Sequence, residues 1–243
     1  MAERPIIWHT RPRDDSTFFA NELAPHGIDS IIGPVLHIAS KPMPQLYVAP
    51  NALLITSRHA THALAVMPAQ WRELPAYCVG HATARAAADH GLTRIISGKL
   101  DVQSLLPRIA GELPSGSNLL YFAGDETRPE VRTMLGARGI NVTMIVVYHA
   151  MAEHHLSSEV CAALAAGSIN AVALFSPRTA RITCDLMEKA GLADAARTMT
   201  AYCFSANVAA DAAGLPWASI QTCSAPTRRA MRELIVSHSL KPL

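Results

Sequence analysis

Hydroxyl, glycine and arginine residues stand in several loops between a short apolar run and a stretch of helical composition. The loops that share this form are Thr56-Ser57-Arg58, Gly80-His81-Ala82-Thr83 and Ser176-Pro177-Arg178. If each apolar run is a strand of an open parallel sheet, its loop lies at the carboxyl end, where such sheets bind ligands. The helix that begins there offers unpaired N–H groups and a positive dipole, and an arginine adds a bidentate grip on a carboxylate. These loops predict an anion-binding edge, although a serine in this place also acts simply as a helix N-cap.

Two further loops and one tyrosine extend this candidate site. Thr10-Arg11-Pro12 follows the apolar run 6–9 in the same way. Gly124 follows the run 119–122, where a glycine allows a ligand to approach the backbone and the acidic residues after it favour capping the next helix. Tyr148 closes the run 141–148 and either offers a hydroxyl proton to a ligand or packs as an amphipathic residue at a strand end. The sequence contains no Ser/His/Asp set, nucleophilic cysteine signature, P-loop or G-x-G-x-x-G pattern.

The charged residues exclude several kinds of partner. The chain of 243 residues has 17 Arg and only 4 Lys, at a formal net charge of +2. So small a charge excludes a polybasic surface for nucleic acid. The excess of arginine fits either a coding bias or an anionic ligand that needs its planar fork. No apolar run reaches the roughly 18–20 residues of a membrane span, and charge interrupts the N-terminal stretch too early for a signal peptide.

The five cysteines are an odd number, are widely spaced and form no C-x-x-C pair. This usage is typical of reduced, buried thiols, so we expect a cytoplasmic protein. The histidine-containing segments lack the spacing of a ligand framework, so no metal site is expected.

The segments that must position the loops alternate between short strands and alanine-rich helices. We expect strands at residues 6–9, 28–32, 53–56, 77–79, 95–96, 119–122, 141–148, 171–175, 201–204 and 219–221. We expect helices at residues 16–26, 58–65, 81–90, 102–113, 128–138, 158–166, 178–190, 207–213 and 227–238, with Ser16 as an N-cap and Gly27 as a stop. Strands separated by helices predict an α/β fold with parallel sheets and helices on both faces.

An internal repeat indicates two similar domains. Residues 76–84 match residues 201–209, and both segments begin with Ala-Tyr-Cys. A strand–Ser–helix segment precedes each of them at nearly the same spacing, at 53–58 and at 173–178. We therefore expect two similar flavodoxin-like lobes; one long doubly wound sheet is the alternative.

Two linkers separate these lobes in the sequence. Residues 40–44 are proline-rich, and residues 150–156 break the periodicity of their surroundings. We expect a discontinuous first lobe at 1–39 plus 153–243 and a second lobe at 45–147. The linkers between them are expected at 40–44 and 148–152, with a ligand cleft between the lobes.

Several motifs follow one another in a specific order along the chain. They are Thr10-Arg11-Pro12, Gly27, Pro34, Leu54-Ile55-Thr56-Ser57, Val79-Gly80-His81-Ala82-Thr83-Ala84, Phe122-Ala123-Gly124-Asp125, Val146-Val147-Tyr148 and Leu174-Phe175-Ser176-Pro177. In this order and spacing, over nearly the whole chain, they resemble the uroporphyrinogen-III synthase family. The resemblance implies two α/β lobes joined by a two-stranded linker. It also implies an enzyme of tetrapyrrole biosynthesis, the route to porphyrins and heme, that uses neither a metal nor an organic cofactor.

The resemblance implies that hydroxymethylbilane, a linear tetrapyrrole polycarboxylate, is cyclised to uroporphyrinogen III with loss of water and inversion of the last pyrrole ring. Such a reaction depends on orientation and electrostatics and needs at most one proton donor, for which Tyr148 is the candidate. The expected substrate-binding residues are Thr10, Arg11, Ser57, Arg58, Gly80, Thr83, Gly124, Ser176, Arg178, Ser205 and Asn207.

The C-terminal half departs from the family's Gly-x-x-Thr-Ala pattern at Ser205-Ala206-Asn207-Val208-Ala209. Because Val208 has no hydroxyl, either Ser205 or Asn207 replaces it, or the chain is a non-catalytic tetrapyrrole- or anion-sensing protein of the same fold. We expect a small-molecule substrate and no nucleic-acid or membrane partner. We also expect a monomer, and a transient contact with hydroxymethylbilane synthase stays open.

Overall fold

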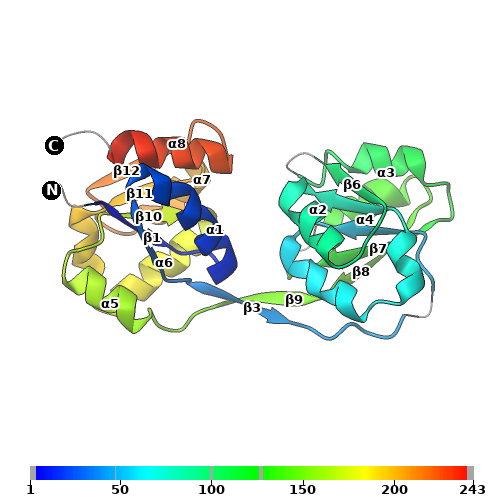
Figure 1. Cartoon of the computed structure of the whole chain (residues 1–243), viewed down its shortest axis with the longest axis horizontal. Helices are drawn as coiled ribbons and strands as arrows, with labels where there is room; N and C mark the ends of the chain where they lie inside the picture. The colour runs from blue at the N-terminus through cyan, green and yellow to red at the C-terminus, as the bar shows by residue number, and fades with distance from the viewer. Residues whose placement is uncertain (1–3, 47, 99–100, 126–127, 240–243) are drawn as a thin grey trace. The chain divides into compact units, whose positions relative to one another are not determined.

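The computed structural model describes residues 4–46, 48–98, 101–125 and 128–239. The described residues divide into two compact units. Unit 1 lies within Met1–His37 and Met151–Leu243, and unit 2 lies within Ile38–Ala150. Each unit contains one five-stranded parallel sheet, so the predicted α/β fold with two similar lobes is confirmed and the single long sheet is excluded (Figure 1).

The sheet of unit 1 has the strand order β12-β11-β10-β1-β2. Its strands are β1 (Ile6–His9), β2 (Asp29–Ile32), β10 (Ala171–Leu174), β11 (Thr200–Cys203) and β12 (Ser219–Thr222). Its helices are α1 (Arg13–Leu23), α5 (Ser158–Ala165), α6 (Pro177–Lys189), α7 (Ala206–Ala212) and α8 (Arg228–Ser239), with short 3₁₀ helices η1 (Ala24–His26) and η4 (Ala193–Thr198). Successive strand residues face opposite sides, so Ile7 packs in the core under α1 and α8 while Trp8 packs in the core under α5, α6 and α7.

The sheet of unit 2 has the strand order β6-β5-β4-β7-β8. Its strands are β4 (Ala52–Ile55), β5 (Ala76–Val79), β6 (Ile95–Gly98), β7 (Asn118–Ala123) and β8 (Asn141–Val146). Its helices are α2 (Gly80–Asp89), α3 (Leu106–Glu112) and α4 (Pro129–Gly136), with 3₁₀ helices η2 (Arg58–Val66) and η3 (Ala69–Glu73). Leu53 packs in the core shared with η2 and α2, and Leu54 packs in the core shared with α3 and α4. Helices therefore cover both faces of this sheet as well.

The two sheets have one topology with different starting points. Numbered along the chain, unit 2 has the order 3-2-1-4-5 and unit 1 has the flavodoxin-like order 2-1-3-4-5. If the count in unit 1 begins at β10, its order also becomes 3-2-1-4-5. The repeat seen in the sequence then pairs β4 with β10 and β5 with β11. Unit 1 is thus a circular permutation of unit 2.

A separate two-stranded sheet joins the units through β3 (Leu36–Ser40) and β9 (Tyr148–Ala152) (Figure 1). The strands are antiparallel, because the N–H of Lys41 donates to the Val147 carbonyl (2.7 Å) and the N–H of Glu153 donates to the Val35 carbonyl (2.9 Å). The expected continuous strand 141–148 is wrong in one respect. Val147 interrupts it by donating to the Ala123 carbonyl, and Tyr148 begins β9 rather than ending β8.

Two further expectations about helices are wrong. Ser16 does not cap the first helix, which begins three residues earlier, after Pro12. The Ser16 hydroxyl is buried and donates to the Arg11 carbonyl (2.7 Å). The expected helix 102–113 forms only as α3, over Leu106–Glu112. Gly27 does end the first helical segment, with a φ of 73° that suits glycine.

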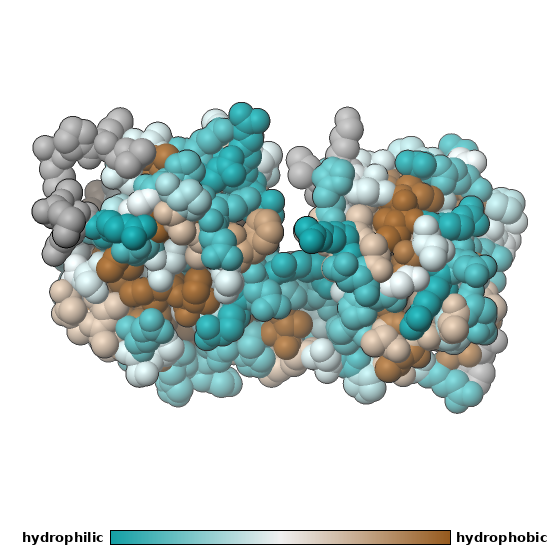
Figure 2. All heavy atoms as spheres, viewed as in Figure 1, coloured by the Kyte–Doolittle hydropathy of each residue, from teal (hydrophilic) through white to brown (hydrophobic). Residues whose placement is uncertain are grey.

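Few large apolar side chains are exposed among the described residues. Large exposed apolar side chains are scattered singly at Phe18, Val48, Val66, Met134 and Met151. The face in Figure 2 is mostly hydrophilic with small apolar groups, which is ordinary for a folded surface. Among the described residues, no helix is long and apolar enough to cross a membrane.

His9 is a buried titratable group at the end of β1. Its side chain is 2% exposed, its Nε2 lies 2.9 Å from the Ser30 hydroxyl, and its ring meets the Phe19 ring edge-on. Burial lowers the pKa of His9 from its usual 6.5 to about 4. The imidazole is therefore neutral in the folded chain at neutral pH.

His9 predicts a loss of stability in mild acid. Between pH 6.5 and 4 the unfolded chain binds a proton at His9 and the folded chain does not, so the free energy of unfolding falls by up to about 3 kcal/mol. Urea denaturation across this pH range should show that His9→Gln removes this part of the pH dependence. His155→Gln, at an exposed position, is the control and should keep it. An unchanged pH dependence in His9→Gln would contradict the assignment.

Candidate functional site

The parallel sheets bring the predicted loops together at one edge within each unit. Because all strands of a sheet run the same way, the residues after them lie at a common carboxyl edge. In unit 1 this edge carries Thr10, Arg11, Phe175, Ser176, Phe204 and Ser205. In unit 2 it carries Thr56, Ser57, Gly80 and Gly124.

The two serines of unit 1 cap the helices that follow them. The Ser176 hydroxyl accepts from the N–H of Thr179, and the Thr179 hydroxyl accepts from the N–H of Ser176, each at 3.1 Å. The Ser205 hydroxyl accepts from the N–H of Val208 at 3.4 Å. The Ser176 and Thr179 hydroxyl oxygens also lie 2.8 Å apart, and either can donate to the other. Each serine oxygen accepts an N–H, so a carboxylate would take the hydroxyl hydrogen, which at Ser176 means replacing the contact with the Thr179 hydroxyl. The role as N-caps and the role in ligand binding are therefore compatible.

Thr10 and Arg11 differ in what they offer to a ligand. The Thr10 side chain is fully buried and its hydroxyl donates to the Ala173 carbonyl (3.0 Å), which ties β1 to β10. Arg11 forms an ion pair with Asp15 (2.9 Å), and its guanidinium lies over the Phe175 ring, 4.9 Å from the centroid. Thr10 thus supports the edge through its packing, and Arg11 places a cation at it.

The Phe175 ring that contacts Arg11 belongs to a cluster of three phenylalanines, which sequence reasoning missed. The Phe175 ring meets Phe19 edge-on at 5.2 Å and Phe204 at 5.3 Å. Phe175 and Phe204 each follow directly on a strand, β10 and β11. The signal for them was the position directly before Ser176 and Ser205, two of the predicted substrate-binding residues.

In unit 2, Ser57 caps η2 by accepting from the N–H of His59 (3.2 Å). Arg58 follows in the first turn, and its carbonyl accepts from the Thr61 hydroxyl. The Thr56 hydroxyl lies 3.3 Å from the Tyr121 hydroxyl. Burial raises the pKa of Tyr121, so this phenol stays protonated at neutral pH.

The first turn of α2 contains the other predicted residues of this unit. Gly80 has a φ of 75°, a left-handed conformation in which a side chain would be strained. Thr83 is 5% exposed, and Val208, its counterpart in the repeat, is 1% exposed. The missing hydroxyl at Val208 therefore falls at a buried position. Asn207, one residue before it, is exposed.

Tyr148 lies directly on the backbone of Gly124. A Cβ at Gly124 would be 2.4 Å from Cζ of Tyr148 and 2.7 Å from its hydroxyl oxygen, so any other residue there would force the phenol to shift. The ring of His59 lies beside the Tyr148 ring, with centroids 5.9 Å apart at 60°. The half-buried Tyr148 also packs against the core of unit 2. The packing alternative from the sequence is thus seen in the structure, and the offer of a hydroxyl proton to a ligand stays a prediction.

The Gly124 turn is also tied to β9 next to Tyr148. Nδ1 of His149 pairs with the carboxylate of Asp125, the residue after Gly124. Sequence reasoning gave Asp125 a capping role and missed His149. This pair links the end of β7 to the strand that carries the tyrosine.

The chemistry available at these edges is anion binding plus a phenol. Helix N-termini, serine hydroxyls and arginines suit carboxylates, and the phenol can donate one proton. Within the ranges that the structure describes, no group of three or more His, Cys, Asp or Glu side chains is placed to hold a metal ion.

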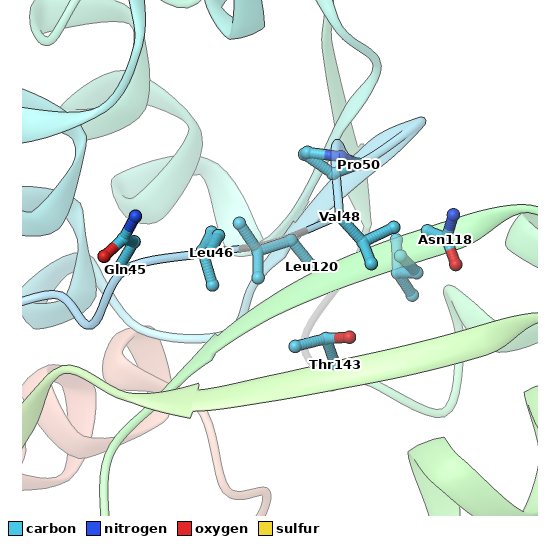
Figure 3. Close-up of a pocket in the computed structure, with 8 residues that line it drawn as sticks. Gln45, Leu46, Val48, Pro50, Asn118, Leu120 and Thr143 are labelled. Carbon is cyan, nitrogen blue, oxygen red and sulfur yellow. The ribbon is translucent and has the colours of Figure 1, made fainter.

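A separate pocket lies away from these edges (Figure 3). Gln45, Leu46, Val48 and Pro50 line it from one segment, and Asn118, Leu119, Leu120 and Thr143 line it from β7 and β8. Asn118 is the first residue of β7, so the pocket lies toward the amino end of that strand. None of the predicted site residues lines it.

Two permuted α/β units, joined by an antiparallel strand pair and presenting capped helices at their carboxyl edges, define a two-lobed α/β protein. The family model for uroporphyrinogen-III synthase HemD matches residues 18–233. The chain therefore belongs to the uroporphyrinogen-III synthase family, and the resemblance drawn from the sequence is confirmed.

Solved structures show the same fold. Uroporphyrinogen-III synthetase from Helicobacter pylori is 19% identical, with a TM-score of 0.61, over 97% of this chain and 99% of that one. A mutant uroporphyrinogen III synthase from the extremely thermophilic bacterium Thermus thermophilus is 17% identical, with a TM-score of 0.52, over 97% and 98%. No curated protein matches the chain.

The contact between Gly124 and Tyr148 predicts the effect of adding one methyl group. Gly124→Ala forces the phenol away and should lower the free energy of unfolding in urea by about 1–3 kcal/mol, as overpacking does. Gly136→Ala is the matched control, because nothing lies within 4 Å of its added Cβ in α4, and it should gain up to about 1 kcal/mol. Removing the ring with Tyr148→Ala should make Gly124→Ala nearly neutral. Equal costs in both backgrounds would show that the contact is unimportant.

Proposed function

We propose that this chain is a cyclising hydro-lyase that converts hydroxymethylbilane into uroporphyrinogen III. The observation that carries the proposal is the family match over residues 18–233. The edges support it, because each presents helix N-termini and hydroxyls suited to a polycarboxylate. The product would enter porphyrin and heme biosynthesis.

The first chemical step breaks the bond between carbon and the leaving hydroxyl of the terminal pyrrole. The electron-rich pyrrole supplies the electron pair, which leaves a delocalised azafulvenium cation. The leaving hydroxyl needs one proton to become water. Tyr148 is the proposed donor, since its phenol carries a hydroxyl hydrogen and the residue lies at the edge beside Gly124.

The remaining steps depend on how the flexible substrate is held. The substituted carbon of the last ring must attack the cation, giving a spiro intermediate that opens and closes again with the ring inverted. The carbon that forms the final bond releases a proton, which balances the one used to form water. Orientation is therefore the main contribution of the protein.

The proposed binding residues divide by chemistry. Ser57, Ser176 and Ser205 donate hydroxyl hydrogens to carboxylates, and Arg11, Arg58 and Arg178 place charge beside them. Gly80 and Gly124 keep the backbone accessible to the substrate, while Thr10 and Thr83 support the edges from buried positions. Asn207 is exposed at the start of α7 and can contribute a further amide. The cytoplasmic location, the monomeric state and the contact with hydroxymethylbilane synthase stay predictions.

The product isomer tests the proposal. Enzymatically generated hydroxymethylbilane should yield the type III isomer in the presence of the chain, separated by HPLC after oxidation to porphyrin. The protein-free reaction is the control and should close without inversion to type I. Type I alone in the presence of the folded chain would exclude the proposed activity and favour a protein that only binds its ligand.

The arginine at the start of α6 predicts a salt-dependent effect on binding. Arg178→Ala should raise KM about three- to tenfold with little change in kcat. This corresponds to a loss of binding free energy between that of an exposed ion pair and that of a charged hydrogen bond. The effect should shrink as salt is added. Arg181→Ala, further along the same helix, where Arg181 forms an ion pair with Asp211 at 3.0 Å, is the matched control and should leave KM unchanged. An equal, salt-independent rise in both variants would indicate a packing role.

A further inference from the structure

His59 is the aromatic neighbour of Tyr148 in unit 2. Its imidazole lies 5.9 Å from the phenol ring, centroid to centroid, at an angle of 60°. Tilted aromatic pairs at this distance attract one another, because the edge of one ring meets the face of the other. His59 therefore influences where the Tyr148 ring rests.

The backbone of His59 is fixed on both sides. Its N–H donates to the Ser57 hydroxyl (3.2 Å), and its carbonyl accepts from Nδ1 of His62 (2.7 Å). The residue lies in the first turn of η2, directly after Arg58. The His59 imidazole therefore projects from the first turn of η2, where hydrogen bonds fix the backbone.

The other boundary of the phenol is Gly124. The ring lies so close that a Cβ there would be 2.4 Å from Cζ of Tyr148. The pair between Asp125 and His149 holds this turn against β9. Without the His59 side chain, the half-buried Tyr148 ring still contacts the backbone of Gly124 but loses its aromatic neighbour. The side-chain torsions of Tyr148 then have more freedom.

We propose that His59 is a positioning residue whose imidazole holds the Tyr148 phenol over Gly124. It acts through Tyr148 and does not itself touch the substrate. The inference rests on the proposed function, in which Tyr148 protonates the leaving hydroxyl. Proton transfer needs heavy atoms about 2.6–3.2 Å apart, so a small displacement of the phenol lowers the rate more than it weakens binding.

A double-mutant cycle on kcat tests this coupling. His59→Ala alone should lower kcat about three- to tenfold, the range of one aromatic pair, with KM within about twofold of the parent. In a Tyr148→Phe background, which has no hydroxyl to misplace, His59→Ala should change kcat by less than about twofold. His59→Phe, which keeps a flat ring, should restore kcat to within about twofold. Multiplicative effects of the two substitutions, or a His59→Phe variant as slow as His59→Ala, would overturn the proposal.

A second measurement does not depend on activity. With the five tyrosines replaced by 3-fluorotyrosine, the ¹⁹F resonance of Tyr148 is assigned by its loss in Tyr148→Phe. His59→Ala should shift and narrow this resonance, whereas His59→Phe keeps it broad and the exposed His155→Ala leaves it unchanged. An unmoved resonance in His59→Ala would overturn the proposal even in an active enzyme. A parent chain that makes no type III isomer would instead contradict the proposed function, while the ¹⁹F result would still decide whether His59 holds the ring.

Discussion

The parallel pairing of strands within each sheet is the constraint on which the rest of the structure depends. Parallel strands covered by helices on both faces must be apolar along their length, and β4 and β10 are buried at every residue. For these two central strands, polar side chains are therefore confined to the residues that follow the strand ends. Because all strands of a sheet point the same way, Ser176 and Ser205, which follow different strands, lie at one edge. The candidate site is a consequence of this direction of the strands.

The two units share one circularly permuted architecture, but different residues stand at the carboxyl edges of their sheets. Thr56 and Phe175 both follow the first strand of the shared order, β4 and β10, and both precede a capping serine. In unit 2 the hydroxyl of Thr56 meets Tyr121, whereas in unit 1 the ring of Phe175 supports the guanidinium of Arg11. The edge of unit 2 thus has a phenol beside Thr56, and the edge of unit 1 has a stacked cation. The same fold has been specialised by single residues at strand ends.

Much of the fold follows from local patterns. Apolar runs such as 171–175, Ser57 and Ser176 as N-caps, and Gly27 as a stop all depend on neighbours in the chain, and they were predicted. The start of the first helix was misplaced because Ser16 looks like a cap, yet Ser16 lies within α1 and its hydroxyl donates to the carbonyl of Arg11, which precedes the helix. Strand β3 was missed because its partner, β9, is more than 100 residues away and its own sequence alternates weakly.

The sequence by itself determined the α/β class, the repeat, the family and the residues that stand at strand ends, since each of these depends on order along the chain. Only the tertiary structure decided which of those residues face one another. It buried the hydroxyl of Thr10, which donates to a carbonyl of β10. It also placed the Tyr148 ring against the backbone of Gly124 and the His59 ring beside the Tyr148 ring. Contacts of this kind join residues 24 to 163 positions apart. No local propensity encodes them, because they exist only once the strands have paired and their ends have been brought together.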